Sequence, residues 1–349
     1  MKIFVTGAGG LIGSEACLHW LSKGDQVFGV DNNSRLAFFG PGGDVTKILE
    51  ELEKHKNFTS IWCDIRNRQT IRDWMLTVDP DVVIHCAAQP SHDKAASIPY
   101  EDFDTNAVGT FNLLEAFRQL NKKDAVFINV STNKVYGDNP NKLPMTEGVL
   151  RFDFSDEHFL NGIDEDMSID KCTHSLFGVS KLAADLAAQE YGRYFGLNIG
   201  TFRGGCLTGS RHASVELHGF LSYIVKQAMS DQSYTIFGYK GKQVRDQIHS
   251  SDVISCFEAF IDAPRPGEVY NLGGGVANSA SILEVIEVIE DVSGKKLNWS
   301  YKDQNRIGDH ICYYTNMNKF KSHYPNWEIK RDLESIVQEL VDWELKGKQ

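Results

Sequence analysis

The chain has 349 residues, of which 42% are hydrophobic and 24% are charged, and its formal net charge at pH 7 is −11. This length suits a large domain with a smaller one and buries a core without disulfides. The acidic balance argues against nucleic-acid binding, which needs a basic face, and no apolar run approaches the ~20 residues that cross a bilayer. We therefore expect neither nucleic acid nor membrane as a partner.

Short apolar strands alternate with helical segments through the first half of the chain. Strands are expected at 3–6, 26–30, 58–63, 82–86, 125–130 and 197–202, and helices at 11–23, 69–76, 107–120 and 176–195. Near-continuous apolar strands separated by helices are typical of a parallel sheet that is covered on both faces. The pattern predicts an α/β fold with a Rossmann-type doubly wound parallel sheet.

The regularity weakens after about residue 205. The segments 216–229, 234–237 and 281–292 predict a smaller C-terminal domain over 206–349, which we expect to bind the substrate. A strand at 269–272 suggests that 240–275 returns to the larger domain, 1–205. Residues 151–170 mix acids with aromatics and lack a clean period, so they form either a solvated surface insertion or a lid.

The seven cysteines are scattered along the chain and form no C-x-x-C pair. This usage predicts reduced core thiols and a cytoplasmic protein. The histidines show no paired ligand spacing, so no metal site is expected.

A glycine turn joins the first strand to the first helix. Gly7, Gly10 and Gly13 permit a tight turn, close approach of the backbone to a pyrophosphate, and close packing of helix on strand. The pyrophosphate is expected at the helix N-terminus, where amides and the helix dipole favour an anion. Asp31 ends the next strand, which is the context that makes this glycine pattern specific for a dinucleotide.

The carboxylate of Asp31 favours NAD over NADP, because it accepts hydrogen bonds from ribose hydroxyls and repels a 2′-phosphate. Arg35 argues the other way, since a nearby arginine accommodates that phosphate. Asp64 follows the third strand and either bonds the adenine amine or caps a helix.

Several segments, together with the glycine turn, resemble motifs of the extended short-chain dehydrogenase/reductase family, the NAD-dependent epimerases and dehydratases. They are His-Cys-Ala-Ala-Gln at 85–89, Asn-x-x-Gly-Thr at 106–110, Ser-Thr-Asn-Lys-Val-Tyr-Gly at 131–137, and Lys181 as the lysine of Tyr-x-x-x-Lys. The resemblance spans roughly residues 1–280. It implies NAD as the cofactor, a nucleotide-sugar substrate, and a homodimer formed through helices 107–120 and 178–195. The implied cofactor-binding residues are Gly7, Gly10, Leu11, Ile12, Gly13, Asp31, Asn32, Ser34, Arg35, Asp64, Ile65, Ala87, Ala88, Gln89, Asn106 and Lys181.

Within this family, the segments 131–138 and 241–252 resemble the branch that epimerises CDP-sugars such as CDP-paratose. Dehydratases of the family carry an acidic pair where this chain has Asn133 and Lys134, so elimination by that route would lack its general acid. The resemblance implies an isomerase of carbohydrate biosynthesis that works by transient oxidation and hydride return. A nucleotide-sugar dehydrogenase or reductase that exchanges NAD with solution is the alternative.

One departure concerns the catalytic tyrosine, because this chain has Phe177 there and a phenyl ring cannot transfer a proton. Either His92 or His174 substitutes as the base, or the chain binds NAD and a nucleotide-sugar without turnover. The resemblance implies that Thr132 bonds the reacting hydroxyl and that the ammonium of Lys181 bonds the nicotinamide ribose. The alternative for Lys181 is a solvated lysine on a helix.

Arginines mark the substrate end, because the planar guanidinium suits phosphate oxygens. Arg245 and Arg306 are the candidates for the diphosphate, with a surface salt bridge as the alternative. Arg203 begins a turn after a strand, which is either a substrate contact or a structural turn. The expected substrate-binding residues are Ser91, Asn133, Arg203, Gly204, Gly205, His218, Arg245 and Arg306.

Overall fold

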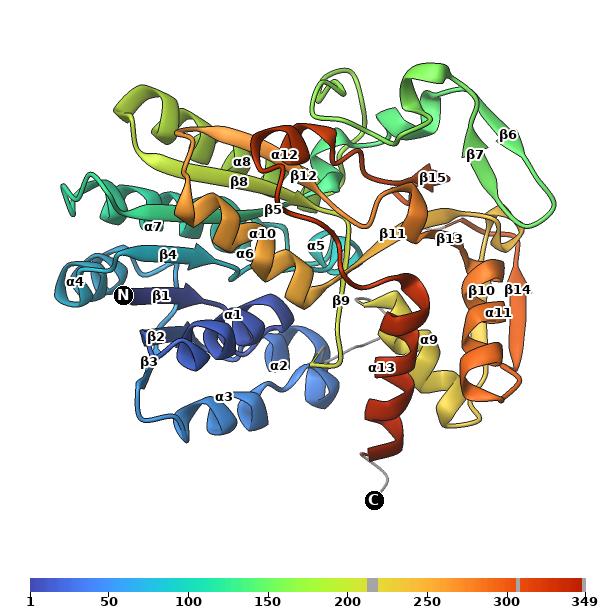
Figure 1. Ribbon diagram of the computed structural model, residues 1–349, viewed down its shortest axis with the longest axis horizontal. Coiled ribbons are helices and arrows are strands. Elements are labelled where there is room, and N and C mark those ends of the chain that lie inside the picture. The colour runs from blue at the N-terminus through green and yellow to red at the C-terminus, as the bar shows by residue number, and fades with distance from the viewer. Residues whose placement is uncertain (212–218, 306–307, 347–349) are drawn as a thin grey trace. The chain divides into compact units, whose positions relative to one another are not determined.

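The computed structural model describes residues 1–211, 219–305 and 308–346 (Figure 1). The chain divides into two compact units. The first comprises Met1–Val135, Ser175–Arg203 and Val253–Tyr270, and the second comprises Tyr136–His174, Gly204–Asp252 and Asn271–Gln349. No helix in the described part of the chain is long and apolar enough to cross a bilayer.

A seven-stranded sheet forms the centre of the first unit, in the order β12-β8-β5-β4-β1-β2-β3 (Figure 1). Adjacent strands run parallel from β3 through β2, β1 and β4 to β5. The strands are β1 (Lys2–Thr6), β2 (Gln26–Asp31), β3 (Phe58–Trp62), β4 (Val82–His85), β5 (Val126–Thr132), β8 (Asn198–Gly204) and β12 (Glu268–Leu272). The expected Rossmann-type α/β sheet is confirmed.

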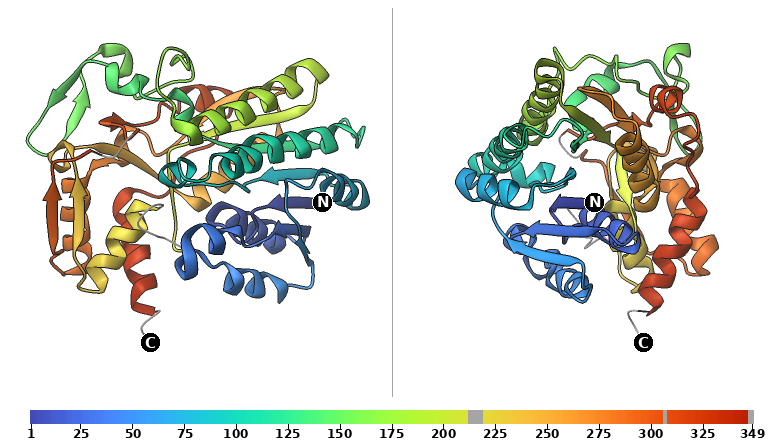
Figure 2. Two further views of the ribbon diagram at one scale, coloured as in Figure 1. Left: turned by 180° about the vertical axis from the view of Figure 1, so that it is seen from behind. Right: turned by 60° about the vertical axis from the view of Figure 1, so that its left-hand side comes forward.

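Helices cover both faces of this sheet (Figure 2). Ile199 of β8 packs with Leu113 and Ala188 on the face that α4, α7 and α8 cover. Its neighbour Gly200 points to the other face, where a Cβ would lie 2.6 Å from the ring of Phe260 in α10. The helices are α1 (Leu11–Ser22), α2 (Ser34–Phe39), η1 (Gly40–Gly43), α3 (Thr46–Glu53), α4 (Arg68–Val78), α5 (His92–Ala95), α6 (Pro99–Phe103), the π-helix η2 (Asp104–Val108), α7 (Gly109–Arg118), η3 (Asn133–Tyr136), α8 (Ser175–Phe195) and α10 (Ser250–Asp262).

The second unit has its own core, in which α9, α11 and α13 pack together through residues such as Ile224, Ile289 and Leu340. Its strands form three small sheets: β10 (Tyr234–Phe237) with β14 (Trp299–Lys302), β6 (Met145–Glu147) with β7 (Phe152–Phe154), and β11 (Val244–His249) with β9 (Cys206–Thr208), β13 (Ser279–Ser281) and β15 (Cys312–Tyr313). Its helices are η4 (Asn139–Lys142), η5 (Glu157–Phe159), α9 (Phe220–Met229), η6 (Tyr239–Gly241), η7 (Val276–Asn278), α11 (Ile282–Ser293), α12 (Asn318–His323) and α13 (Leu333–Lys346).

The two units do not follow the boundary expected at residue 205. The segment 136–174 belongs to the second unit, and only 253–270 of the expected return joins the first. The return occurs because β12 adds to the sheet beside β8 while α10 covers the same end.

The segment 151–170 is neither a detached loop nor wholly solvated. Its strand β7 pairs with β6, and Ile163 is fully buried. The backbone amide of Ile163 donates to the carbonyl oxygen of Tyr314 at 2.8 Å, and its carbonyl oxygen accepts from Asn316 at 2.9 Å. These contacts build the segment into the second unit, which argues against a freely moving lid.

Candidate active site

The glycine turn has the geometry that a bound pyrophosphate needs. Gly7 has a φ of +72°, and a Cβ there would lie 2.8 Å from the backbone nitrogen of Ala87. A Cβ on Gly13 would lie 2.0 Å from the carbonyl oxygen of Gly7. Helix α1 begins after Gly10, and no described side chain caps its first turn. The first amides and the helix dipole therefore favour an anionic ligand.

Asp31 lies beside this turn at the end of β2. Its Oδ2 accepts from the amide of Gly9 at 2.9 Å, and its Oδ1 accepts from the amide of Asn33 at 2.7 Å. The Arg35 guanidinium packs over the ring of Phe39 at 5.1 Å, and burial lowers its pKa. The carboxylate is thus held at the edge of the turn, as the acceptor of ribose hydroxyls should be.

Asp64 is part of a polar cluster on the neighbouring strand end. Asn32 donates from Nδ2 to Asp64 at 3.1 Å and accepts from the amide of Ser34 at 3.1 Å. Arg66, which sequence reasoning missed, donates from Nε and Nη2 to the two oxygens of the same carboxylate. Burial opposes ionisation of Asp64, but the hydrogen bonds from Arg66 outweigh it and lower its pKa. The cap of α4 is Asn67, so the capping alternative for Asp64 is wrong.

His85, at the end of β4, forms side-chain hydrogen bonds with both β1 and α7. Its Nδ1 lies 2.7 Å from Thr6 Oγ1, and its Nε2 lies 2.8 Å from Thr110 Oγ1. Complete burial, followed by the charge of Lys181, lowers its pKa to about 3. The imidazole is therefore neutral and structural. It positions the segment that follows β4 against the glycine turn.

Asn106 holds that segment from the other side. Its Oδ1 accepts from the amide of Gln89 at 2.9 Å, and its Nδ2 donates to the carbonyl oxygen of Gln89 at 3.1 Å. The other expected cofactor residues in the first unit are Leu11, Ile12, Ile65, Ala87 and Ala88.

Lys181 is a residue of α8, and its ammonium lies near the C-terminal end of β5. Its Nζ donates to the carbonyl oxygen of Val130 at 2.7 Å. The side chain is 5% exposed, and burial lowers its pKa to about 8. The alternative of a solvated helix lysine is therefore wrong. Thr132 follows Val130 on the same strand, and its Oγ1 accepts from the amide of Lys134 at 3.3 Å. Phe177, one turn before Lys181 on α8, is buried.

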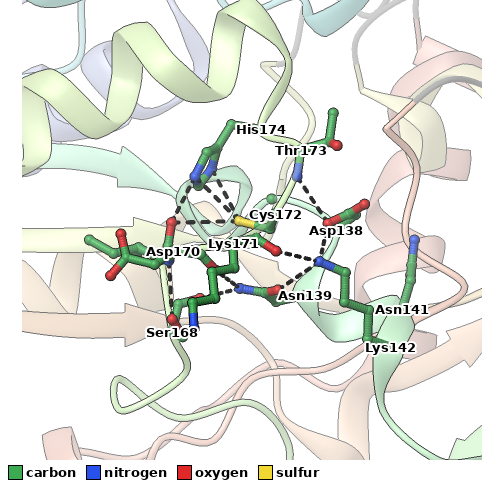
Figure 3. Close-up of polar contacts among 12 residues, drawn as sticks. Asp138, Asn139, Asn141, Lys142, Ser168, Asp170, Lys171, Cys172, Thr173 and His174 are labelled. Carbon is green, nitrogen blue, oxygen red and sulfur yellow. Dashed lines mark hydrogen bonds and ion pairs between the residues drawn. The ribbon is translucent and has the colours of Figure 1, made fainter.

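The two candidate histidines lie in different surroundings. The ring of His92, at the start of α5, lies 6.4 Å from the ring of Phe177, centroid to centroid. His174 belongs to the second unit, where its Nε2 lies 2.8 Å from the carbonyl oxygen of Ile169 and 3.3 Å from the sulfur of Cys172 (Figure 3). Because a carbonyl only accepts, that nitrogen of His174 carries the hydrogen.

The loop 168–174 that carries His174 is anchored by the segment that follows β5 (Figure 3). Asn139 donates from Nδ2 to the carbonyl oxygen of Asp170 at 3.0 Å, and Lys142 donates from Nζ to that of Lys171 at 2.8 Å. This arrangement favours a structural role for His174.

Arg203 is bound within the core of the first unit. Its Nε and Nη2 donate to the two carboxylate oxygens of Asp185 at 3.0 and 2.9 Å. Ser131 donates to the same carboxylate at 2.6 Å. Sequence reasoning missed Asp185, whose place inside α8 gives no local signal. The buried bidentate pair favours the structural alternative for Arg203.

Arg245 lies in the second unit with its guanidinium bound to main-chain and side-chain oxygens. Its Nη2 donates to the carbonyl oxygen of His310 at 2.6 Å and to the carboxylate of Asp309. It pairs with Asp309, as the salt-bridge alternative requires, but Arg245 is buried and the pair is therefore not a plain surface salt bridge. His218 and Arg306 lie outside the described residues.

The other substrate candidates are placed as follows. Ser91 accepts from the amide of Lys94 at 3.1 Å, Asn133 is buried beside Thr132, Gly204 ends β8, and Gly205 donates to the carbonyl oxygen of Leu272 at 2.9 Å. Within the described ranges, no three His, Cys, Asp or Glu side chains gather in a way that could hold a metal ion.

Residues 3–273 match the model of the NAD dependent epimerase/dehydratase family. The chain is 32% identical to CDP-paratose 2-epimerase of Salmonella typhi, over 98% of this chain and 99% of that protein. It is 28% identical to UDP-glucuronate 4-epimerase of Thermodesulfobacterium geofontis, over 97% and 94%. A mutant of UDP-glucuronic acid 4-epimerase from Bacillus cereus, solved with UDP-4-deoxy-4-fluoro-glucuronic acid and NAD, superimposes with a TM-score of 0.80 at 27% identity, covering 99% of this chain and 100% of that one.

Proposed function

The chain belongs to the NAD dependent epimerase/dehydratase family, whose cofactor is NAD, and from this premise we propose that it epimerises a CDP-sugar such as CDP-paratose. The observation that carries the proposal is the buried ammonium of Lys181, which donates to the carbonyl oxygen of Val130, two residues before Thr132 at the end of β5. The similarity to CDP-paratose 2-epimerase over nearly the whole of both chains supports the choice of sugar nucleotide.

The residues of the first unit fit NAD. The turn at Gly7 and Gly13 leaves no room for side chains where the backbone must approach a pyrophosphate. Asp31 presents a carboxylate to the adenosine ribose, and Lys181 presents an ammonium to the nicotinamide ribose. NAD held by these residues would supply reversible hydride transfer at the sugar carbon.

The side chains around Thr132 then orient the sugar hydroxyl and transfer its proton. The hydroxyl of Thr132 hydrogen-bonds the sugar oxygen and orients it. As the sugar C–H bond breaks, the hydroxyl proton passes to the imidazole of His92 and a ketone forms. After the sugar presents its opposite face, the same imidazole returns the proton to the oxygen. Phe177 forms an apolar wall that excludes water from this step.

We assign the proton transfer to His92 rather than His174. The ring contact between His92 and Phe177 places an imidazole beside the position where the family tyrosine would stand. His174 donates from Nε2 to a carbonyl within an anchored loop, which leaves it poorly placed to accept a proton there.

The choice of epimerisation over elimination rests on the two residues after Thr132. Dehydratases of the family need an acid there, and this chain has Asn133 and Lys134. Neither the side-chain amide of Asn133 nor the ammonium of Lys134 takes the place of that carboxyl group.

The proposal is tested by incubating the purified protein with CDP-paratose and identifying the product by NMR. Conversion to a stereoisomer without accumulation of free reduced NAD is the expected result. Steady release of reduced NAD would identify a dehydrogenase instead. Conversion of UDP-sugars but not CDP-sugars would contradict the assigned nucleotide.

Phe177 favours a second candidate, a protein that binds NAD and a nucleotide-sugar without turnover, because the family's proton-transferring phenol is absent. Binding of CDP-sugars by calorimetry, with no product over a panel of nucleotide-sugars, would support it.

A further inference from the structure

A cluster of five polar side chains is buried in the first unit, and one of them, Ser180, adjoins Lys181 in the sequence and contacts the carbonyl oxygen of Phe177. None of the five is more than 1% exposed, and they are Gln89, Ser91, Asp102, Asn106 and Ser180. Burying a carboxylate is costly unless it is well hydrogen-bonded, so the position of Asp102 calls for a physical reason.

On one side, the cluster fixes the residue before His92. Gln89 accepts from the amide of Ser91 at 2.6 Å and donates to the carbonyl oxygen of Ser91 at 2.9 Å. The same Gln89 Nε2 donates to Asp102 Oδ1 at 2.7 Å. Ser91 in turn caps α5 by accepting from Lys94. Asp102 thus holds, through one glutamine, the turn from which His92 projects.

On the other side, the cluster fixes helix α8. Ser180 donates from Oγ to Asp102 Oδ2 at 2.6 Å, and the same Ser180 Oγ lies 3.0 Å from the carbonyl oxygen of Phe177. Ser180 directly precedes Lys181. The bond therefore holds α8 at the turn that presents both Phe177 and Lys181.

Asn106 closes the network between the two sides. Its Nδ2 lies 3.0 Å from Ser180 Oγ and 3.2 Å from Asp102 Oδ1, while it also binds the backbone of Gln89. The two oxygens of Asp102 thus face different structural elements, one toward Gln89 and one toward Ser180. Asn106 also joins Gln89 to Ser180, but Asp102 is the member of the cluster whose two oxygens accept from both of their side chains.

We propose that Asp102 is a positioning residue that sets the spacing between His92 and the Phe177–Lys181 face of α8. Because Asp102 is 1% exposed, we expect it to act through its neighbours and not by touching substrate or cofactor. It joins the turn that carries the proposed base to the helix that carries the ammonium. Loss of its hydrogen bonds would therefore displace His92 and Lys181 relative to the sugar. The inference rests on the proposed function for its effect on turnover, but its effect on cofactor binding is independent of the substrate.

Two substitutions separate positioning from simple loss of packing. Asp102→Ala removes both acceptor oxygens and leaves Asn106 as the remaining link of the cluster between the turn and α8. Asp102→Asn keeps an acceptor for Gln89, and its amide can donate to Ser180 Oγ, which then donates to the carbonyl oxygen of Phe177. Asp104→Ala is the matched control, because Asp104 is an exposed acid two residues along the chain.

The experiment measures kcat and KM for CDP-paratose in the wild type and the three variants, at a temperature where circular dichroism shows each to be folded. Misplacement of catalytic groups by about 1 Å costs on the order of 100-fold, so Asp102→Ala should lower kcat by about that factor with KM little changed. Asp102→Asn should recover most of the rate, and Asp104→Ala should match the wild type. A wild-type kcat in folded Asp102→Ala would overturn the proposal.

Titration with reduced NAD, followed by its fluorescence, requires no sugar. Because α8 carries Lys181, Asp102→Ala should weaken binding severalfold, whereas Asp102→Asn and Asp104→Ala should not. If the wild type turns over no nucleotide-sugar but shows this binding pattern, the proposed function fails and the positioning role stands. Equal affinity in all four proteins would overturn the positioning role, whatever the substrate.

Discussion

The rings of His92 and Phe177 lie 6.4 Å apart, centroid to centroid, with an angle of 59° between their planes. This contact puts a titratable ring beside the residue that replaces the family tyrosine. The imidazole can transfer a proton that the phenyl ring cannot.

We expect His92→Ala to reduce turnover of CDP-paratose by at least about 100-fold, which is the usual contribution of a positioned general base. His174→Ala is the matched control and should retain activity, because His174 is held by the carbonyl oxygen of Ile169. Stopped-flow measurement of reduced NAD in the enzyme resolves the oxidation step. Full activity in both variants would leave Lys181, water or the substrate as the proton acceptor.

Phe177→Tyr tests whether a phenol improves the site. If His92 is the base, the added hydroxyl should be neutral or should slow turnover, since Phe177 is only 7% exposed and the new group must be accommodated. The same stopped-flow assay checks it. A clear gain in sugar oxidation would show instead that the site had lost its base and that the phenol restores it.

Binding of NAD should weaken as the pH rises through about 8. Burial lowers the pKa of Lys181 to about 8, so the ammonium is present below that pH and is lost above it. Affinity should fall by up to about tenfold for each pH unit above 8, because binding favours the protonated form. Calorimetry over this range measures it. Lys181→Met should bind weakly without this dependence, whereas the exposed-lysine control Lys123→Met should behave like the wild type.

NADP should bind at least about tenfold more weakly than NAD, since Asp31 repels a 2′-phosphate. Asp31→Asn should narrow the difference between the two cofactors by removing the charge while keeping an acceptor for the amide of Gly9. Calorimetry with both cofactors checks this. The exposed-acid control Asp73→Asn should leave the preference unchanged, and equal affinities in the wild type would refute the role given to Asp31.

The protein should form a homodimer through α7 and α8. These helices expose large hydrophobic side chains that a monomer would leave in water, namely Phe111, Val179, Leu186, Tyr194 and Phe195. Light scattering at micromolar concentration should report a dimer. Leu186→Lys should give a monomer by placing a charge in the interface, whereas a wild-type monomer would contradict the prediction.

Local sequence signals were enough to predict the sheet, the glycine turn and Asp31, because each depends on residues that are close together in the sequence. A strand needs only a run of apolar residues, and a dinucleotide turn needs glycines between a strand and a helix. The return of β12 followed from the same signal at 269–272. Helices α10 and α13 were not anticipated, although they complete the two cores.

The chemistry of individual side chains was decided by contacts between residues distant in the sequence. Lys181 is buried because α8 packs on β5. Arg203 of β8 forms its ion pair with Asp185 because β8 lies beside α8. Sequence spacing gave His92 and His174 equal standing, and only the packing of α5 against α8 brought one of them to Phe177. Periodicity and turn chemistry report local backbone geometry, so the sequence alone determined the fold and the cofactor turn. Burial, ion pairing and pKa depend on neighbours far along the chain, so only the tertiary structure decided which polar groups are available for catalysis.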